Sequence, residues 1–127
     1  MAFLVLRQQL HTVQAIGFKS DETPKPMIKF IGKIPNESVI DVEGVVKKLD
    51  KKSTCSINDL EIGVKKLYVI SRSKSVLPFQ MEDALRNEND KEEKETIVQL
   101  KTRLDNRVLD LRIPSNIAIF RIQSGVC

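Results

Sequence analysis

An aromatic and an amide side chain near the start of the chain could together bind a nucleobase. Two short apolar segments flank a polar stretch there, which is the pattern of a β-hairpin. If the turn is centred on residues 8–9, Phe3 lies opposite Gln14 on one face of the hairpin. An aromatic ring stacks on a base, and an amide donates and accepts hydrogen bonds at the base edge. The pattern alone leaves open that Phe3 fills the core and that Gln14 merely faces solvent.

A short helix and two strands are predicted after the hairpin. Apolar residues recur at helical spacing between positions 27 and 34, and Pro26 suits the first helical position. Residues 39–49 form a β-rich segment in which Gly44 permits a bend. In the next strand the apolar alternation shifts at residues 65–66, which predicts a β-bulge.

This order of elements is typical of an oligonucleotide-binding barrel (OB-fold), an all-β, five-stranded Greek-key fold. The predicted helix then lies between the third and fourth strands of the barrel. Four strands can be counted, so we expect the first to precede Met1 and its absence to expose a sheet edge. We assign residues 1–78 to the barrel and residues 79–127 to an acidic loop and a helical hinge.

The helical hinge is predicted from two apolar patterns. Leu100, Leu104, Val108 and Leu111 fall near helical spacing, and Pro114 breaks this pattern. Ser115 is expected to cap a final helix, whose apolar residues are Ile119, Phe120 and Ile122.

Charge is distributed unevenly along the chain. The formal net charge is +4, with +5 on residues 1–81, −4 on residues 82–95 and +3 on residues 96–127. A basic body is compatible with phosphate contacts but does not require them. Cys55 and Cys127 lack metal-ligand spacing, so we expect two free thiols in a reducing compartment. We find neither a signal peptide nor a segment apolar enough to cross a membrane, and therefore expect a soluble, cytosolic protein.

Several sequence blocks resemble the anticodon-binding domain of eukaryotic cytosolic aspartyl-tRNA synthetases. The resemblance covers nearly the whole chain, and its most specific part is the block at residues 102–112. The blocks, in chain order, are residues 3–9 with 13–14, 37–48, 59–62, 67–71, 102–112 and 119–127.

The resemblance implies a role for three side chains in reading the anticodon. Phe3 matches the aromatic residue that stacks on the central anticodon base, and Gln14 matches a base-reading glutamine. Glu61 matches a glutamate of the fourth strand, where a carboxylate accepts hydrogen bonds from bases and repels phosphates. Without the resemblance, Glu61 would be an ordinary exposed strand residue.

Basic residues near these positions are candidates for phosphate contacts. Lys47, Lys48, Lys51 and Lys52 could follow an RNA backbone, although a solvated strand end explains them equally well. Arg7 follows the proposed stacking strand and could bind a phosphate or a neighbouring base. The charged residues between 103 and 112 are expected to form ion pairs and interface packing, not catalytic groups.

The resemblance implies a parent enzyme that joins aspartate to aspartate tRNA with ATP and Mg²⁺. Its active-site motifs would lie beyond residue 127, so we expect no catalysis and no cofactor in this part alone. The expected partners are the anticodon loop, a second copy in a homodimer, and a multi-synthetase complex. Two other functions remain open, namely a general module for single-stranded nucleic acid and a protein-interaction or dimerisation domain.

Overall fold

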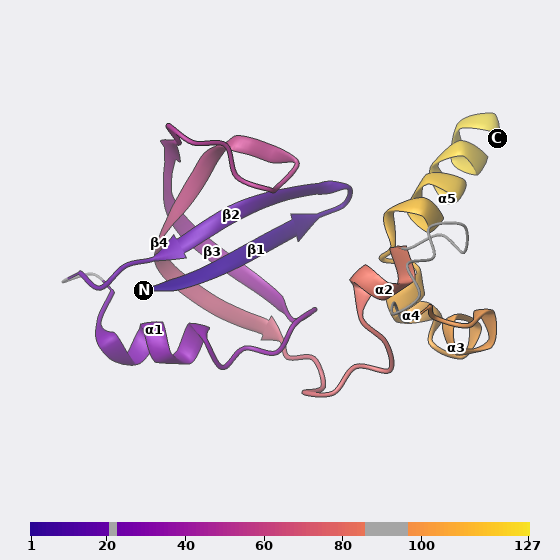
Figure 1. Cartoon of the computed structure of the whole chain (residues 1–127), viewed down its shortest axis with the longest axis horizontal. Coiled ribbons are helices and arrows are strands. Elements are labelled where there is room, and N and C mark those ends of the chain that lie inside the picture. Colours follow the sequence, from indigo (N-terminus) through magenta and orange to yellow (C-terminus); the bar gives the residue numbers. More distant parts are fainter. Residues whose placement is uncertain (21–22, 86–96) are drawn as a thin grey trace. The chain divides into compact units, whose positions relative to one another are not determined.

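The computed structural model describes residues 1–20, 23–85 and 97–127. The chain divides into two compact units, Met1–Ser75 and Val76–Cys127 (Figure 1). The sequence analysis placed this division between residues 78 and 79. The strands of the described residues belong to the first unit, and the second unit is helical.

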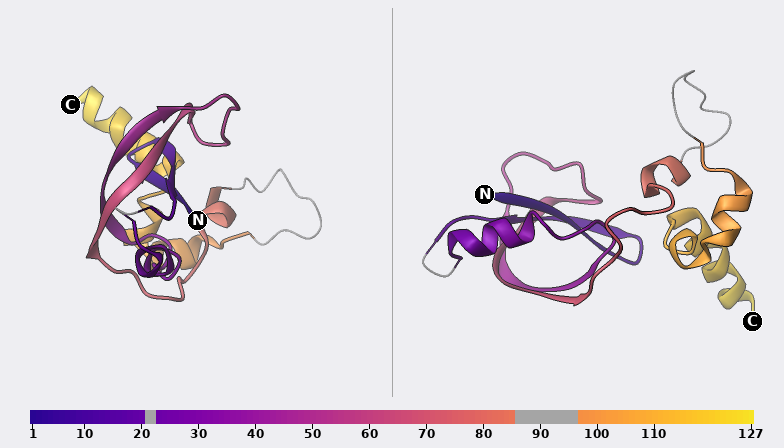
Figure 2. Two further views of the ribbon diagram at one scale, coloured as in Figure 1. Left: turned by 90° about the vertical axis from the view of Figure 1, so that its left-hand side faces the viewer. Right: turned by 90° about the horizontal axis from the view of Figure 1, so that it is seen from below.

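The first unit is a four-stranded mixed sheet with one short helix. Its strands are β1 (Ala2–Gln8), β2 (His11–Gly17), β3 (Val39–Lys48) and β4 (Ile57–Ser71). They lie in the order β1-β2-β4-β3, in which the β1/β2 and β3/β4 pairs are antiparallel and β2 pairs with β4 in parallel. Figure 2 shows that the sheet is strongly curled, with β3 and β4 bending away from the hairpin.

Strand alternation and one helix make the core of this unit. Ala15, Ile31 and Val64 are its buried centre, and apolar residues of β1, α1, β3 and β4 pack against them. Helix α1 (Lys25–Ile31) has Pro24 as its N-cap residue and ends at Gly32, close to the predicted bounds. The helix packs on Gly17, because a Cβ there would lie 3.1 Å from Ile28 Cδ1.

The hairpin has the predicted faces but a different register. The turn is Gln9-Leu10, so Phe3 lies opposite Ile16, and Gln14 lies opposite Val5. The prediction that Phe3 and Gln14 are direct partners is therefore wrong; they share a face and are diagonal neighbours. The difference in register is two residues, so each side chain keeps its predicted face. The turn that sets the register has Gln9 in the left-handed region (φ 55°), where Gly or Asn would usually reveal the turn in the sequence.

The predicted bulge in β4 is confirmed. Glu43 pairs with Lys66 and Gly44 pairs with Val64, so Lys65 has no partner in β3. Gly44 lies at the point of closest approach, where a Cβ would be 2.4 Å from the carbonyl oxygen of Gly63 and 2.8 Å from Ile62 Cγ2. The absence of a side chain at Gly44 therefore permits the bend of the β3/β4 pair.

The second unit contains four helices among its described residues. They are α2 (Met81–Leu85), α3 (Leu100–Asp105), α4 (Arg107–Asp110) and α5 (Pro114–Val126). Their buried core consists of Phe79, Met81, Ala84, Leu109 and Ile113. Part of the predicted acidic loop is thus helical and contributes to the core, while its residues 86–96 lie outside the described residues.

The predicted apolar face of the hinge is wrong in its details. Leu100, Leu104 and Val108 are exposed, because the backbone breaks at Asn106 and separates α3 from α4. The break turns Leu109 inward instead. Helix α5 begins at Pro114 with Ile113 as its N-cap residue, so Ser115 is not the cap.

The ion pairs expected between residues 103 and 112 are present, and they meet at a buried carboxylate. Asp110 is 1% exposed and accepts a hydrogen bond from Arg103 Nε at 2.7 Å. The Arg107 guanidinium donates to its other oxygen, and Asn116 Nδ2 donates to the Asp110 carbonyl at 2.9 Å. These contacts join α3, α4 and α5. They also satisfy the Asp110 carboxylate, since a buried carboxylate is stable only when it is paired.

Two chemical expectations can be compared with the structure. Cys55 and Cys127 are both free thiols, the first buried and the second exposed. None of the helices in the described ranges is long and apolar enough to cross a membrane.

We predict that Gly44→Ala lowers the free energy of unfolding by about 1–3 kcal/mol, because its Cβ would collide with the backbone of β4. Urea denaturation of the chain measures this change. Gly32→Ala is the matched control, since a Cβ there meets its nearest atom at 3.8 Å. Equal unfolding midpoints for the two variants would contradict the role given to Gly44.

Candidate nucleic-acid interface

The parallel pairing of β2 with β4 brings two predicted base readers side by side. Gln14 is the register partner of Glu61, and Ala15 is the partner of Ile62. Since Ala15 and Ile62 belong to the core, the alternation of both strands turns Gln14 and Glu61 to the outer face. Both side chains are half-buried in the sheet surface.

A lysine completes this row on the other side of Glu61. Lys47 of β3 is the antiparallel partner of Glu61, so Gln14, Glu61 and Lys47 cross three adjacent strands, and we call them the polar row. The Lys47 side chain extends over the neighbouring Gly63: a Cβ built there would lie 3.7 Å from Lys47 Cε and 3.9 Å from its Nζ. The polar row therefore offers an amide, a carboxylate and an ammonium group on one surface.

The polar atoms of this row are available to a ligand. Within residues 1–20, 23–85 and 97–127, neither the Gln14 amide nor the Glu61 carboxylate has a hydrogen-bond or ion-pair partner. Both groups remain accessible, since the described residues contain no buried side-chain polar atom without a partner. An amide and a carboxylate left free in a sheet surface can hydrogen-bond the edge of a base.

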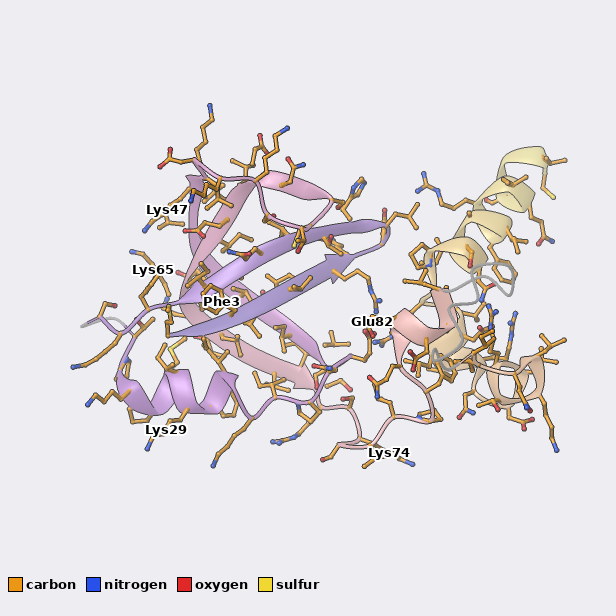
Figure 3. The ribbon with its side chains drawn as sticks, viewed as in Figure 1. Phe3, Lys29, Lys47, Lys65, Lys74 and Glu82 are labelled. Atoms are coloured by element: carbon orange, nitrogen blue, oxygen red, sulfur yellow. The ribbon has the colours of Figure 1, made fainter. Side chains whose placement is uncertain are left out.

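Phe3 lies on the same face, one row further along the sheet. It is 60% exposed and pairs with Ile16, which in turn is the register partner of Gly63 (Figure 3). The ring is thus exposed, and the alternative that Phe3 fills the core is excluded. Its flat face beside the polar row provides a surface on which a base can stack.

Two of the other basic candidates, Arg7 and Lys48, lie differently. The Arg7 guanidinium forms an ion pair with Glu37, where the side chains are 25% and 15% exposed. This contact joins β1 to the segment just before β3 and engages the group expected to bind phosphate. Lys48 is exposed, but it pairs with Leu60 and so belongs to the opposite set of alternating positions from Lys47.

Gly63 is a site residue that the sequence analysis did not single out. It lies beside Glu61 on the outer face, between Ile16 of β2 and Val45 of β3. Its missing side chain leaves the space next to the polar row into which the Lys47 side chain extends. A glycine within a strand is a known sign of close approach, and this signal was present in the sequence.

The fold is similar to that of solved aminoacyl-tRNA synthetases. An aspartyl-tRNA synthetase from Leishmania major superposes with a TM-score of 0.91 and 43% identity, over 98% of this chain and 24% of the other. The Entamoeba histolytica aspartyl-tRNA synthetase gives 0.89 and 39%, over 98% and 29%. An asparaginyl-tRNA synthetase from Pyrococcus horikoshii gives 0.66 and 27%, over 96% and 24%. The chain therefore has the structure of one part of an aminoacyl-tRNA synthetase.

Sequence comparison identifies the relatives more narrowly. The chain is 50% identical to the cytoplasmic aspartate–tRNA ligase of Bos taurus and 44% identical to that of Caenorhabditis elegans, in each case over 98% of this chain and 25% of the relative. The expected resemblance to aspartyl-tRNA synthetases is thus confirmed, and the chain spans about a quarter of the length of these relatives. No protein-family model matches the chain.

We predict that Arg7→Ala lowers the free energy of unfolding by about 1–3 kcal/mol, because the half-buried Glu37 carboxylate loses a charged hydrogen-bond donor. Phe3→Leu in the same strand should change it by less than about 0.5 kcal/mol, since the ring is exposed. Thermal unfolding of both variants checks this difference. If Arg7→Ala unfolds like the unsubstituted chain, Arg7 is not held by Glu37 and is available to RNA.

Proposed function

We propose that this chain is the anticodon-recognition module of a cytoplasmic aspartate–tRNA ligase, the enzyme that attaches aspartate to its tRNA with ATP. The observation that carries this proposal is the pairing of Gln14 with Glu61 beside the exposed Phe3 ring. The similarity to cytoplasmic aspartate–tRNA ligases supports the choice of tRNA.

The geometry supports a division of labour among the four side chains. Phe3 stacks on one anticodon base, while Gln14 and Glu61 hydrogen-bond to base edges. A carboxylate repels phosphate, so Glu61 favours a bound loop whose bases, not its backbone, face the sheet. Lys47 supplies a cation next to Glu61, where it can contact the phosphate of a splayed nucleotide. Arg7, which is paired with Glu37, and Lys48, which alternates to the other side of β3, have no role in this division.

We infer that the four-stranded sheet is part of a five-stranded OB barrel. Its order leaves β1 and β3 as the two edges, and the ion pair between Arg7 and Glu37 links β1 to the segment that leads into β3, which supports this inference. One additional strand pairing with both edges would close the curled sheet into a barrel. The helix between β2 and β3 fits this topology.

Catalysis would belong to the remainder of the protein. The chain corresponds to about a quarter of the length of its relatives, so we assign ATP, Mg²⁺ and aspartate binding to the other three quarters of such an enzyme. Formation of a homodimer, and of a multi-synthetase complex, are likewise proposals for the whole protein. We expect the 127-residue chain alone not to aminoacylate tRNA.

We predict that Phe3→Ala weakens binding of an aspartate-tRNA anticodon stem-loop by about 5- to 100-fold, because a base loses its stacking partner. Fluorescence anisotropy with a labelled stem-loop measures this loss. Tyr68→Ala is the matched control, since Tyr68 is a similarly exposed aromatic residue (56%) further along β4. Equal losses for the two variants would contradict a specific stacking role.

We predict that Glu61→Gln reduces discrimination between the aspartate anticodon and a changed anticodon more than it reduces affinity. The substitution preserves the shape of the side chain but replaces a charged acceptor with an amide. This changes which hydrogen bonds residue 61 can form with a base edge. Competition between the two stem-loops gives the ratio of affinities. Unchanged discrimination would remove Glu61 from the reading surface, and equal binding of both loops by the unsubstituted chain would favour a general single-strand module.

A further inference from the structure

A reciprocal set of hydrogen bonds joins the hairpin to a distant loop. The Thr12 amide donates to Ser56 Oγ at 2.7 Å, and the Ser56 amide donates to Thr12 Oγ1 at 2.9 Å. Ser56 Oγ also donates to the Thr12 carbonyl at 3.2 Å. Each residue thus binds the other through both its backbone and its side chain, and we call this set the Thr12–Ser56 latch.

The latch attaches a lysine-bearing loop to the strand that carries Gln14. The loop comprises residues 49–56 between β3 and β4, and it carries Lys51 and Lys52 (Figure 1). Two other hydrogen bonds, from the Leu49 amide to Asp59 and from the Ser53 amide to Asn58, close the loop against its own end. They do not contact β2, whereas the latch extends the contact between β2 and β4 from the Val13–Ile57 pair into the end of the loop.

The position of the latch relates the loop to the reading surface. Thr12 is two residues before Gln14, so both lie on the outer face of β2. Ser56 immediately precedes β4, which leads to Glu61. The loop is therefore anchored at the end of the face on which Gln14 and Glu61 meet.

The two lysines of this loop suit phosphate contacts. Both side chains are exposed, and in the part of the chain that the structure describes neither has an ion-pair partner. Cys55 of the same loop is buried, and the hydrogen bonds described above order the loop. A loop that is already ordered loses less conformational freedom when its lysines bind an RNA backbone.

We propose that Thr12 and Ser56 are positioning residues that hold Lys51 and Lys52 for contact with RNA phosphates next to the nucleotides bound at Gln14 and Glu61. The inference rests on the proposed function and extends it from the bases to the backbone. The lysines supply the salt-dependent part of the binding free energy. The latch holds the loop in the position from which the lysines reach the phosphates.

A double-mutant cycle tests this coupling. The variants are Ser56→Ala, the pair Lys51→Ala with Lys52→Ala, and all three together, each titrated with the aspartate-tRNA anticodon stem-loop at several KCl concentrations. We expect Ser56→Ala to weaken binding about 2- to 10-fold and to reduce the salt slope by up to about 1.4, the value for two phosphate contacts to a single strand. Once both lysines are absent, Ser56→Ala should have no further effect.

Two variants separate the latch from general stability. Ser53→Ala removes a hydroxyl from the same loop that accepts a bond from the Cys55 amide at 3.3 Å, and binding should be unchanged. Ser56→Thr retains the hydroxyl and should restore binding and the salt slope. Thermal unfolding of each variant establishes that the chain is folded at the temperature of the titration.

The outcomes distinguish this inference from the proposed function. Equal losses from Ser56→Ala with and without the lysines, or an unchanged salt slope, would overturn the positioning role. The same titrations with a changed anticodon test the proposed function separately, because the lysine coupling does not require discrimination between bases. Failure of the unsubstituted chain to bind either stem-loop would overturn both.

Discussion

The parallel pairing of β2 with β4 is the constraint on which the candidate surface depends. It connects segments far apart in the chain, and it fixes which residues of the hairpin stand beside which residues of β4. Because neighbouring positions of a strand face opposite sides, a shift of one residue would bury Glu61 and expose Ile62. The core contacts of Ala15, Ile62 and Val64 exclude such a shift. The same apolar packing that stabilises the sheet therefore sets the arrangement of the polar row.

The curl of the sheet originates in the backbone of the long β3/β4 pair. The strands approach too closely at Gly44 for a side chain, and the extra residue Lys65 is accommodated as a bulge in the same region. A bulge increases the local twist of a strand pair. The long pair can thus lie in the sheet at one end and bend away from the hairpin at the other.

The sequence was sufficient to predict features that depend on alternation within one segment. The outer position of Glu61 and the bulge near Lys65 followed from the spacing of apolar residues, whereas the spacing left open whether Phe3 fills the core. The pairing of Gln14 with Glu61 could not be predicted, because a parallel register between distant segments leaves no local pattern. The hairpin register was missed because a turn with Gln9 in the left-handed region lacks the usual glycine. In the second unit, the break at Asn106 exchanged the exposed and buried leucines.

The loop before β4 has a consequence for how this surface can change during evolution. β4 pairs with β2 at Ile57, departs from it, and rejoins it at Glu61, so the position of Glu61 is set after the loop has ended. Insertions between residues 49 and 55 can therefore lengthen the lysine-bearing segment without moving Glu61 away from Gln14. A change in the length of this loop would alter the affinity for a polynucleotide backbone while leaving the specificity for bases unchanged. Recognition of sequence and strength of attachment are thus separable traits in this architecture.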